Sequence, residues 1–180
     1  MAEIIKMAVT FDKDFFEWLV EADLQCKKDL QTAVEKSVIT KANVVAMDEK
    51  EQGVRVVLNY GHTFAHVVEN ETNYSRYLHG EAVAIGMHMA NTLACKLGLL
   101  SAEEVLRVEN LLQKHGLPTR YAIKDYEKFY DGFFLDKKTF NQNIKFILPK
   151  SIGGYEIHDD IEKSLVLEVL ETCSLGGGTL

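Results

Sequence analysis

The sequence contains only two prolines and three cysteines among its 180 residues. The three cysteines, Cys26, Cys95 and Cys173, are odd in number and widely spaced, so they indicate neither a disulfide framework nor a cysteine-based zinc site. Two prolines and twelve glycines favour a helix-rich chain over a sandwich or barrel with many turns. We therefore expect a mainly helical protein in a reducing cytoplasm.

An excess of positive charge is also absent. The chain has 20 Lys and Arg against 27 Asp and Glu, for a net charge of −7, and offers no general attraction to nucleic acid or to an anionic membrane. The first apolar run, MAEIIKMAV, is too short to span a bilayer and lacks the features of a signal peptide. We expect a partner that is neither a nucleic acid nor a membrane.

Apolar residues recur at helical spacing along most of the chain, which at 47% hydrophobic can build one core. This spacing predicts helices over residues 12–20, 30–45, 61–69, 79–98 and 101–115. Asp12 is the expected N-cap of the first of these helices, and Ser101 with Glu104 matches a capping box. The runs NIKFILP and GGYEIH predict one hairpin, and SLVLEVLE predicts a last helix. We expect a mainly α, multi-helix domain over residues 1–173 with a small C-terminal β-hairpin, and a frayed tail over 174–180.

Three histidines fall within a short stretch, at His62, His66 and His79. His62 and His66 are four residues apart, so on a helix both rings share one face and could meet one metal ion or one ligand. Two polar residues on a solvated face would show the same spacing. His79 favours a site, because it begins an apolar helix in which an unpaired ring would be costly to desolvate.

A catalytic metal ion commonly has histidine and carboxylate ligands, and Glu3 is the candidate carboxylate. Glu3 and Lys6 place an acid and a base on one face of an otherwise apolar helix. This arrangement suits a site better than packing, although a solvated ion pair would have the same spacing.

Side chains that could bind an anionic substrate beside a metal precede the histidines. They are Lys41, Arg55 and Asn59, with Glu51 among them, and Lys137 and Lys138 form a second basic pair. Each could instead be a solvated surface residue. His88, His115 and His158 are interpreted as structural, and neither a glycine-rich phosphate loop nor a dinucleotide fingerprint is found in the sequence.

Five strings carry a family resemblance: AEIIK, KANVVAMDEKEQGVR, LNYGHTFAH, LHGEAVAIGM and LDKK. In this order and spacing they resemble the C-terminal domain of 3-dehydroquinate synthase, most strongly over residues 1–98. That family combines an N-terminal NAD-binding α/β domain with a helical domain, and its active site lies in the cleft between them. The resemblance implies that the NAD-binding domain is absent from this chain.

The resemblance also implies roles for the candidate residues. Glu3, His62 and His79 match the ligands of a metal, usually zinc and otherwise cobalt, which replaces the pairing of His62 with His66. His66 matches a histidine near the substrate hydroxyl that is oxidised. The remaining matches are Lys6, Lys41, Arg55 and Asn59 to substrate-binding residues, Glu51 to an active-site carboxylate, and Lys137 or Lys138 to a phosphate-binding lysine.

The reaction implied by the resemblance converts 3-deoxy-D-arabino-heptulosonate 7-phosphate to 3-dehydroquinate and phosphate, in the shikimate pathway of aromatic amino acid biosynthesis. We expect a homodimer for the full-length lyase and no turnover by this chain alone. The alternatives are another sugar-phosphate cyclase, a metal-dependent polyol dehydrogenase, or a non-catalytic helical module. Ala65 stands where the family commonly has glycine, and its methyl group could crowd the helix approach.

Overall fold

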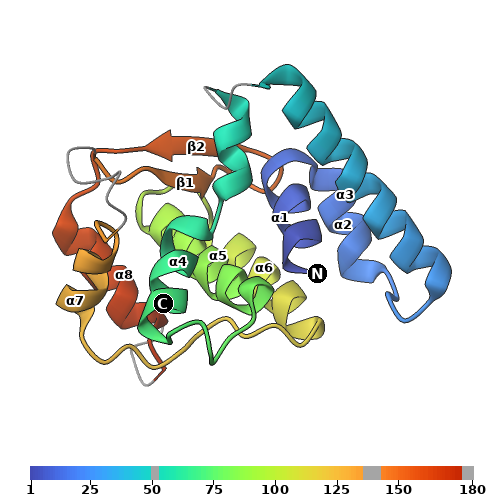
Figure 1. The fold of residues 1–180 in the computed structure, drawn as a ribbon. Coiled ribbons are helices and arrows are strands. Elements are labelled where there is room, and N and C mark those ends of the chain that lie inside the picture. The colour runs from blue at the N-terminus through green and yellow to red at the C-terminus, as the bar shows by residue number, and fades with distance from the viewer. Residues whose placement is uncertain (50–52, 136–142, 176–180) are drawn as a thin grey trace.

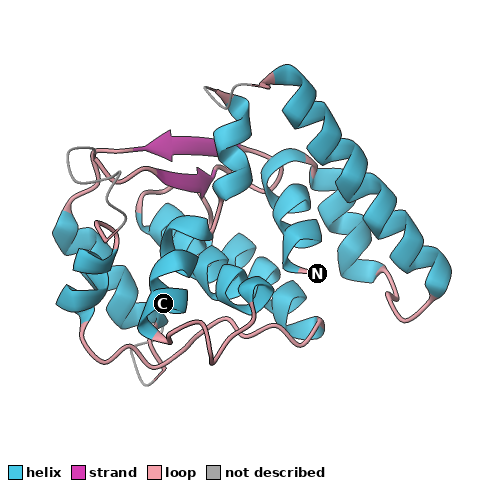
Figure 2. Cartoon of the chain, in the orientation of Figure 1, coloured by secondary structure: helices cyan, strands magenta, loops and turns pink. Residues whose placement is uncertain are grey.

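The computed structural model describes residues 1–49, 53–135 and 143–175. Its elements (Figure 1) are α1 (Ala2–Phe11), α2 (Lys13–Glu21), α3 (Lys27–Met47), the 3₁₀ helix η1 (Val54–Asn59), α4 (His62–Glu71), α5 (His79–Lys96), α6 (Ala102–Lys114), α7 (Tyr126–Gly132), β1 (Phe146–Pro149), β2 (Tyr155–His158) and α8 (Lys163–Cys173). The two strands pair antiparallel and form a hairpin among helices (Figure 2). The predicted fold class, mainly α with a small C-terminal β-hairpin, is confirmed.

Helix α5 lies in the middle of the core and packs against α1, α4, α6, α8 and β1. Every residue from Ala82 to Ala94 is buried, as expected for a helix that is apolar on most sides. The helix is followed by Gly98, whose φ of +74° is a left-handed conformation that glycine adopts without a Cβ clash. None of the helices in the described ranges has the length and apolar composition to cross a bilayer.

The predicted helix caps form. Asp12 Oδ1 accepts a hydrogen bond from the Phe15 amide at 2.8 Å. The Ser101 hydroxyl accepts one from the Glu104 amide at 3.2 Å, and Glu104 Oε2 accepts one from the Ser101 amide at 2.9 Å. These bonds satisfy amides that have no partner within the first turn of a helix.

Two short helices of the structure, η1 and α7, were not predicted from the sequence, because neither is long enough to show a helical period. The predicted frayed tail also begins differently. Leu175 donates its amide hydrogen to the Tyr121 carbonyl at 3.1 Å, and the Ser174 hydroxyl accepts from the Ile123 amide at 3.1 Å. Both residues are therefore held against the domain, while the rest of the predicted tail, 176–180, lies outside the described residues.

Helices α4 and α5 approach one another closely at Gly86. A Cβ at this position would lie 2.1 Å from the Gly61 carbonyl oxygen and 2.9 Å from the Ala65 nitrogen. Ala65, whose methyl group could crowd the helix approach, is fully buried beside this contact. The glycine at position 86 leaves room for the Ala65 backbone.

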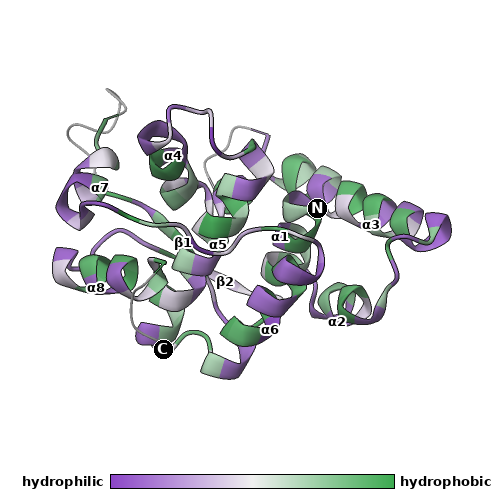
Figure 3. Cartoon of the chain, turned by 90° about the horizontal axis from the view of Figure 1, so that it is seen from below, coloured by the Kyte–Doolittle hydropathy of each residue, from purple (hydrophilic) through white to green (hydrophobic). Residues whose placement is uncertain are grey.

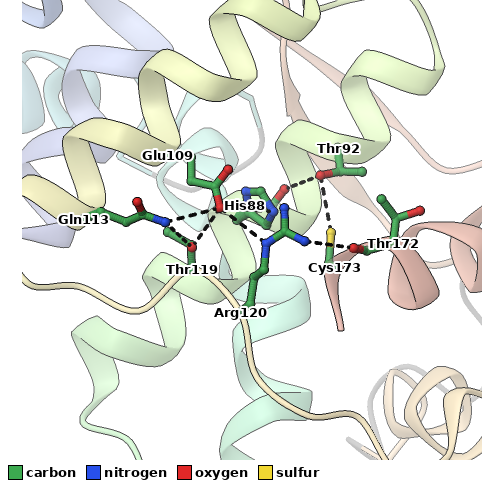
Figure 4. Close-up of polar contacts among 8 residues, drawn as sticks. All are labelled: His88, Thr92, Glu109, Gln113, Thr119, Arg120, Thr172 and Cys173. Atoms are coloured by element: carbon green, nitrogen blue, oxygen red, sulfur yellow. Dashed lines mark hydrogen bonds and ion pairs between the residues drawn. The ribbon is translucent and has the colours of Figure 1, made fainter. Parts of the chain in front are cut away.

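A buried polar cluster joins α5, α6 and α8 (Figure 4). Glu109 Oε1 accepts a hydrogen bond from the Thr119 hydroxyl at 3.0 Å and lies 3.4 Å from Arg120 Nε. Arg120 also donates to the Thr172 carbonyl at 3.1 Å. The His88 ring lies beside this cluster, with Nε2 3.8 Å from Glu109 Oε1, and neither of its nitrogens has a hydrogen-bond partner among the described residues. The cluster thus ties the segment after α6 to the C-terminal helix.

We predict that His88 makes the protein less stable in acid. Burial lowers the pKa of His88 from 6.5 to about 4, with Arg120 lowering it further and Glu109 raising it. Between pH 6.5 and 4 the His88 imidazole is protonated in the unfolded chain and neutral in the folded chain. The free energy of unfolding therefore falls by up to about 3 kcal/mol as the pH drops from 6.5 to 4. Urea unfolding of metal-free protein at several pH values would measure this slope.

His88→Gln should flatten that slope, and His158→Gln, at the end of β2 and half-buried, should leave it unchanged. An equal slope in the wild type and His88→Gln would contradict the assignment.

We predict that Gly86→Ala destabilises the fold by about 1–3 kcal/mol, because its methyl group would overlap the backbone of Gly61 and Ala65. Gly80→Ala is the matched control in the same helix, since a Cβ there would meet only the Ala2 methyl at 3.9 Å. We expect this control to be neutral or slightly stabilising. Thermal unfolding of both variants would compare them, and equal melting temperatures would contradict the close approach.

Candidate metal centre

Three helices each bring one candidate ligand to the same place. Glu3 lies in the first turn of α1, and His62 and His79 are the first residues of α4 and α5. One ligand atom from each of the three lies within 4.8 Å of the other two. A tetrahedral zinc ion with bonds of about 2.0–2.2 Å holds its ligands roughly 3.3–3.6 Å apart, so small side-chain rotations would bring these atoms to ligand distance.

Hydrogen bonds orient both histidine rings. His62 Nδ1 lies 3.2 Å from the Tyr60 carbonyl oxygen, and His79 Nδ1 lies 2.8 Å from Glu69 Oε1. Acceptors at these positions favour the tautomer with hydrogen on Nδ1, which leaves Nε2 as the free lone pair. Histidines that bind a metal commonly donate their other ring N–H to a carboxylate, which fixes the orientation of the ring.

One oxygen of Glu3 has a partner and the other does not. Oε2 pairs with Lys6 Nζ at 2.7 Å, whereas Oε1 is buried, with no hydrogen-bond partner among the residues that the structure describes. Oε1 lies 3.9 Å from His62 Nε2. Burial raises the pKa of Glu3, but Lys6, His62 and His79 outweigh it and lower the pKa overall. An ionised, unpaired oxygen beside two imidazoles is suited to a cation.

Lys6 brings a positive charge into the wall of this centre. Its side chain is 3% exposed and its ammonium also donates to the Leu58 carbonyl at 2.5 Å. Burial lowers the pKa of Lys6, Glu3 raises it, and the nearby charge of Lys41 lowers it further. The ammonium is thus fixed between α1 and η1, where it can face an anionic ligand.

Besides Lys6, the structure describes four other predicted site residues, His66, Lys41, Asn59 and Arg55. His66 is exposed, and its ring centroid is 5.9 Å from that of His62, but the ligand group joins His62 with Glu3 and His79 instead. Lys41 and Asn59 are exposed. Arg55 Nη1 donates to the Glu49 carbonyl at 2.9 Å. The three remaining candidates, Glu51, Lys137 and Lys138, lie outside the described residues.

Glu69 is the residue that sequence reasoning missed. Its side chain is buried and bonded to His79, so it orients the ring from behind. Glu69 follows His62 by seven residues, which places both on one face of α4. An acid on the buried face of a helix that starts with a candidate ligand was the available signal.

Comparison with known proteins gives one family. Residues 1–139 match the family described as 3-dehydroquinate synthase C-terminal. The chain is 61% identical over 171 residues to the 3-dehydroquinate synthase of Wolinella succinogenes and 56% identical over 171 residues to that of Helicobacter pylori strain J99. Each match covers 95% of this chain and 49% of the relative. The chain therefore spans about half the length of these curated relatives.

Solved structures share the fold. A 2-epi-5-epi-valiolone synthase from Streptomyces hygroscopicus subsp. jinggangensis, with NAD⁺ and Zn²⁺ bound, matches with a TM-score of 0.84 at 25% identity, over 96% of this chain and 49% of that one. A 2-deoxy-scyllo-inosose synthase, complexed with carbaglucose-6-phosphate, NAD⁺ and Co²⁺, has a TM-score of 0.73 at 23% identity, over 94% of this chain and 49% of that one. The second likeness extends the shared fold to a more distant sequence.

We predict that this chain binds about one zinc ion through the three converging side chains. His79→Ala should reduce zinc affinity by more than about 100-fold, and Glu69→Gln by roughly 10–100-fold, because Glu69 only orients the ring. Zinc titration of chelator-treated protein would measure both. His158→Ala is the matched control and should bind zinc like the wild type, and unchanged affinity in His79→Ala would remove His79 from the ligand group.

Proposed function

The chain belongs to the 3-dehydroquinate synthase C-terminal family, and from this premise we propose that it is the metal- and substrate-binding half of a 3-dehydroquinate synthase. The complete enzyme would convert 3-deoxy-D-arabino-heptulosonate 7-phosphate to 3-dehydroquinate and phosphate. The observation that carries the proposal is the convergence of Glu3, His62 and His79. In this group Glu3 Oε1 is buried and has no hydrogen-bond partner among the described residues.

Glu3, His62 and His79 would hold a zinc or cobalt ion. Their one carboxylate and two imidazoles fit such an ion, and three protein ligands leave a coordination position for substrate. When bound, the metal would polarise the hydroxyl that is oxidised and NAD would accept and return the hydride. Glu69 and the Tyr60 carbonyl would keep the two rings in the tautomer that binds metal.

His66 is proposed as the general base, and Lys6 is proposed to bind an anionic group of the substrate. His66 is exposed beside His62, so its ring could accept the proton of a substrate hydroxyl held at the centre. Lys6 is fixed by Glu3 and the Leu58 carbonyl, so its ammonium could hold an anionic substrate group with little loss of side-chain freedom. Glu51 is proposed as a further active-site carboxylate from the family resemblance.

A ring of polar groups would position the substrate. Lys41 and Asn59 are exposed, Lys41 is close enough to Lys6 for their charges to interact, and the Arg55 backbone amide donates to Asp48 Oδ2 at 3.0 Å. Lys137 or Lys138 is proposed as the phosphate-binding lysine. A flexible phosphorylated sugar acid has several charges to orient, and its orientation can supply much of the rate gain.

The NAD-binding domain would be supplied by the half of the relatives that this chain does not span. The comparison structures with NAD⁺ are also about twice as long as their matched regions. We propose that the chain alone is inactive, that the complete enzyme is a cytoplasmic homodimer, and that residues 1–173 form its helical domain. The three cysteines are unpaired, which suits the cytoplasm.

Three alternatives follow from the same fold. Another sugar-phosphate cyclase or a metal-dependent polyol dehydrogenase could share the metal ligands, and a non-catalytic module could share only the fold. The cationic set favours a phosphorylated, acidic substrate over an uncharged polyol, because Lys6, Lys41 and Arg55 all lie on or near the elements that hold the ligands.

A fusion protein tests the proposed activity. The half of the Wolinella succinogenes enzyme that precedes the matched region would be joined to Met1 and assayed for phosphate release with substrate, NAD⁺ and Zn²⁺. We predict turnover by the fusion. Arg55→Ala should lower kcat/KM by roughly 10–100-fold at unchanged zinc content, as expected for loss of a hydrogen-bonded charge.

Arg107→Ala is the matched control, since Arg107 pairs with Glu17 on the surface between α6 and α2 and such pairs contribute little. A fusion that binds zinc and NAD⁺ but releases no phosphate would favour the non-catalytic module. Normal activity of Arg55→Ala would refute its substrate-binding role.

A further inference from the structure

Helix α3 is the least covered long helix of the described chain. It packs against α1 and η1 and lies at the edge of the molecule in two perpendicular views (Figures 1 and 3). Along its 21 residues only Ala33 and Val44 are buried. Large apolar residues remain exposed on the rest of the helix, and exposed apolar surface of this kind is typical of an interaction site.

Part of this exposed surface forms one continuous line. Leu30, Val34, Val38, Lys41 and Val45 follow one another at intervals of three or four residues, so they lie on one face of the helix, which we call the α3 stripe. Val45 is half-buried and the other four are exposed. The stripe is thus a mostly apolar helix face with a single charge, at Lys41, near one end. Such a face is suitable for packing against another folded domain.

The first end of the stripe lies at the start of the chain. Leu30 and Met1 line the same surface groove. The matched family describes a C-terminal region, and the match covers 49% of the Wolinella succinogenes enzyme. In such a relative, the preceding half would therefore enter next to the position of Leu30.

The other end of the stripe lies at the candidate site. Lys41 is close enough to Lys6 for their charges to interact. The two elements on which α3 packs, α1 and η1, also carry Glu3 and Arg55. A body that closed over a substrate at Lys41 would also lie across Val38, one helical turn away.

We infer that the α3 stripe is the docking surface for the NAD-binding half of the enzyme. This inference rests on the proposed function, because that function identifies the missing partner as an NAD-binding domain. A second copy of this chain could also cover exposed apolar residues. It would give no reason for a stripe that runs from the groove at Met1 to a charged residue at the site.

Cysteine protection tests the inference with a matched pair of positions. Val38 and Ile39 are both 60% exposed and are adjacent, but only Val38 belongs to the stripe, since one residue turns the helix by about 100°. Each would be replaced by cysteine in a Cys26→Ser background, which removes the exposed native thiol. The rate of thiol alkylation would be measured in the isolated chain and in the fusion described above.

In the isolated chain, Val38→Cys and Ile39→Cys should react at similar rates. In the fusion, Val38→Cys should react at least about tenfold more slowly, because the docked domain must open before the thiol is reached, and Ile39→Cys should change less than about twofold. Equal rates for Val38→Cys in the two proteins, or equal protection of both positions, would overturn the inference.

Two further measurements separate the explanations. Protection of Val38→Cys that appears in the isolated chain and disappears on dilution would assign the stripe to a second copy, and would overturn the inference. Phosphate release by the fusion reports on the proposed function separately. Release without protection of Val38→Cys would refute the docking surface alone, whereas protection without release would refute the proposed function and leave the docking surface in place.

Discussion

Backbone contact between α4 and α5 is the constraint on which the candidate metal centre depends. Gly61 turns the chain into α4 with a φ of +81°, and a Cβ there would lie 2.7 Å from Met87 Cγ. Because His62 follows Gly61 directly and His79 begins α5, the packing of two helices determines how far apart the two rings lie. A site built on helix starts is held more rigidly than one built on loops. The third candidate ligand, Glu3, joins through α1, which also packs on α5.

The candidate metal centre also contains a buried charge, that of Lys6 in its ion pair with Glu3, of a kind that protein cores normally exclude. Lys6 is almost fully buried, and its pair with Glu3 adds little net stability, because desolvation of both charges offsets their attraction. Glu3 Oε1 is left without a hydrogen bond among the described residues, which costs further free energy. The apolar packing around α5 must supply the stability that this corner lacks. A local arrangement that is unfavourable for folding and held in place by its surroundings is typical of a functional site.

Sequence patterns predicted the elements that have strong local signals. The Asp12 cap and the Ser101 capping box formed where the sequence placed them, because each depends on residues within one helical turn. The convergence of Glu3 with the two histidines was implied by family resemblance and could not come from spacing, since residues on three helices meet only through tertiary packing. Spacing alone paired His62 with His66. Glu69 was missed because its role depends on a partner from another helix.

Periodicity in α3 shows why a helical pattern does not identify what a helix packs against. Leu30, Val34 and Val38 repeat like core positions, yet this domain buries a different face of the helix, at Ala33 and Val44. The hydrophobic period therefore predicted the helix correctly and could not distinguish a core face from a docking face. An exposed apolar face of this kind would be favourable when a partner covers it and would favour association when it is left open. Because the core is built around α5 and the stripe lies outside it, folding of this domain and the proposed docking would use different residues, and a change in one need not disturb the other.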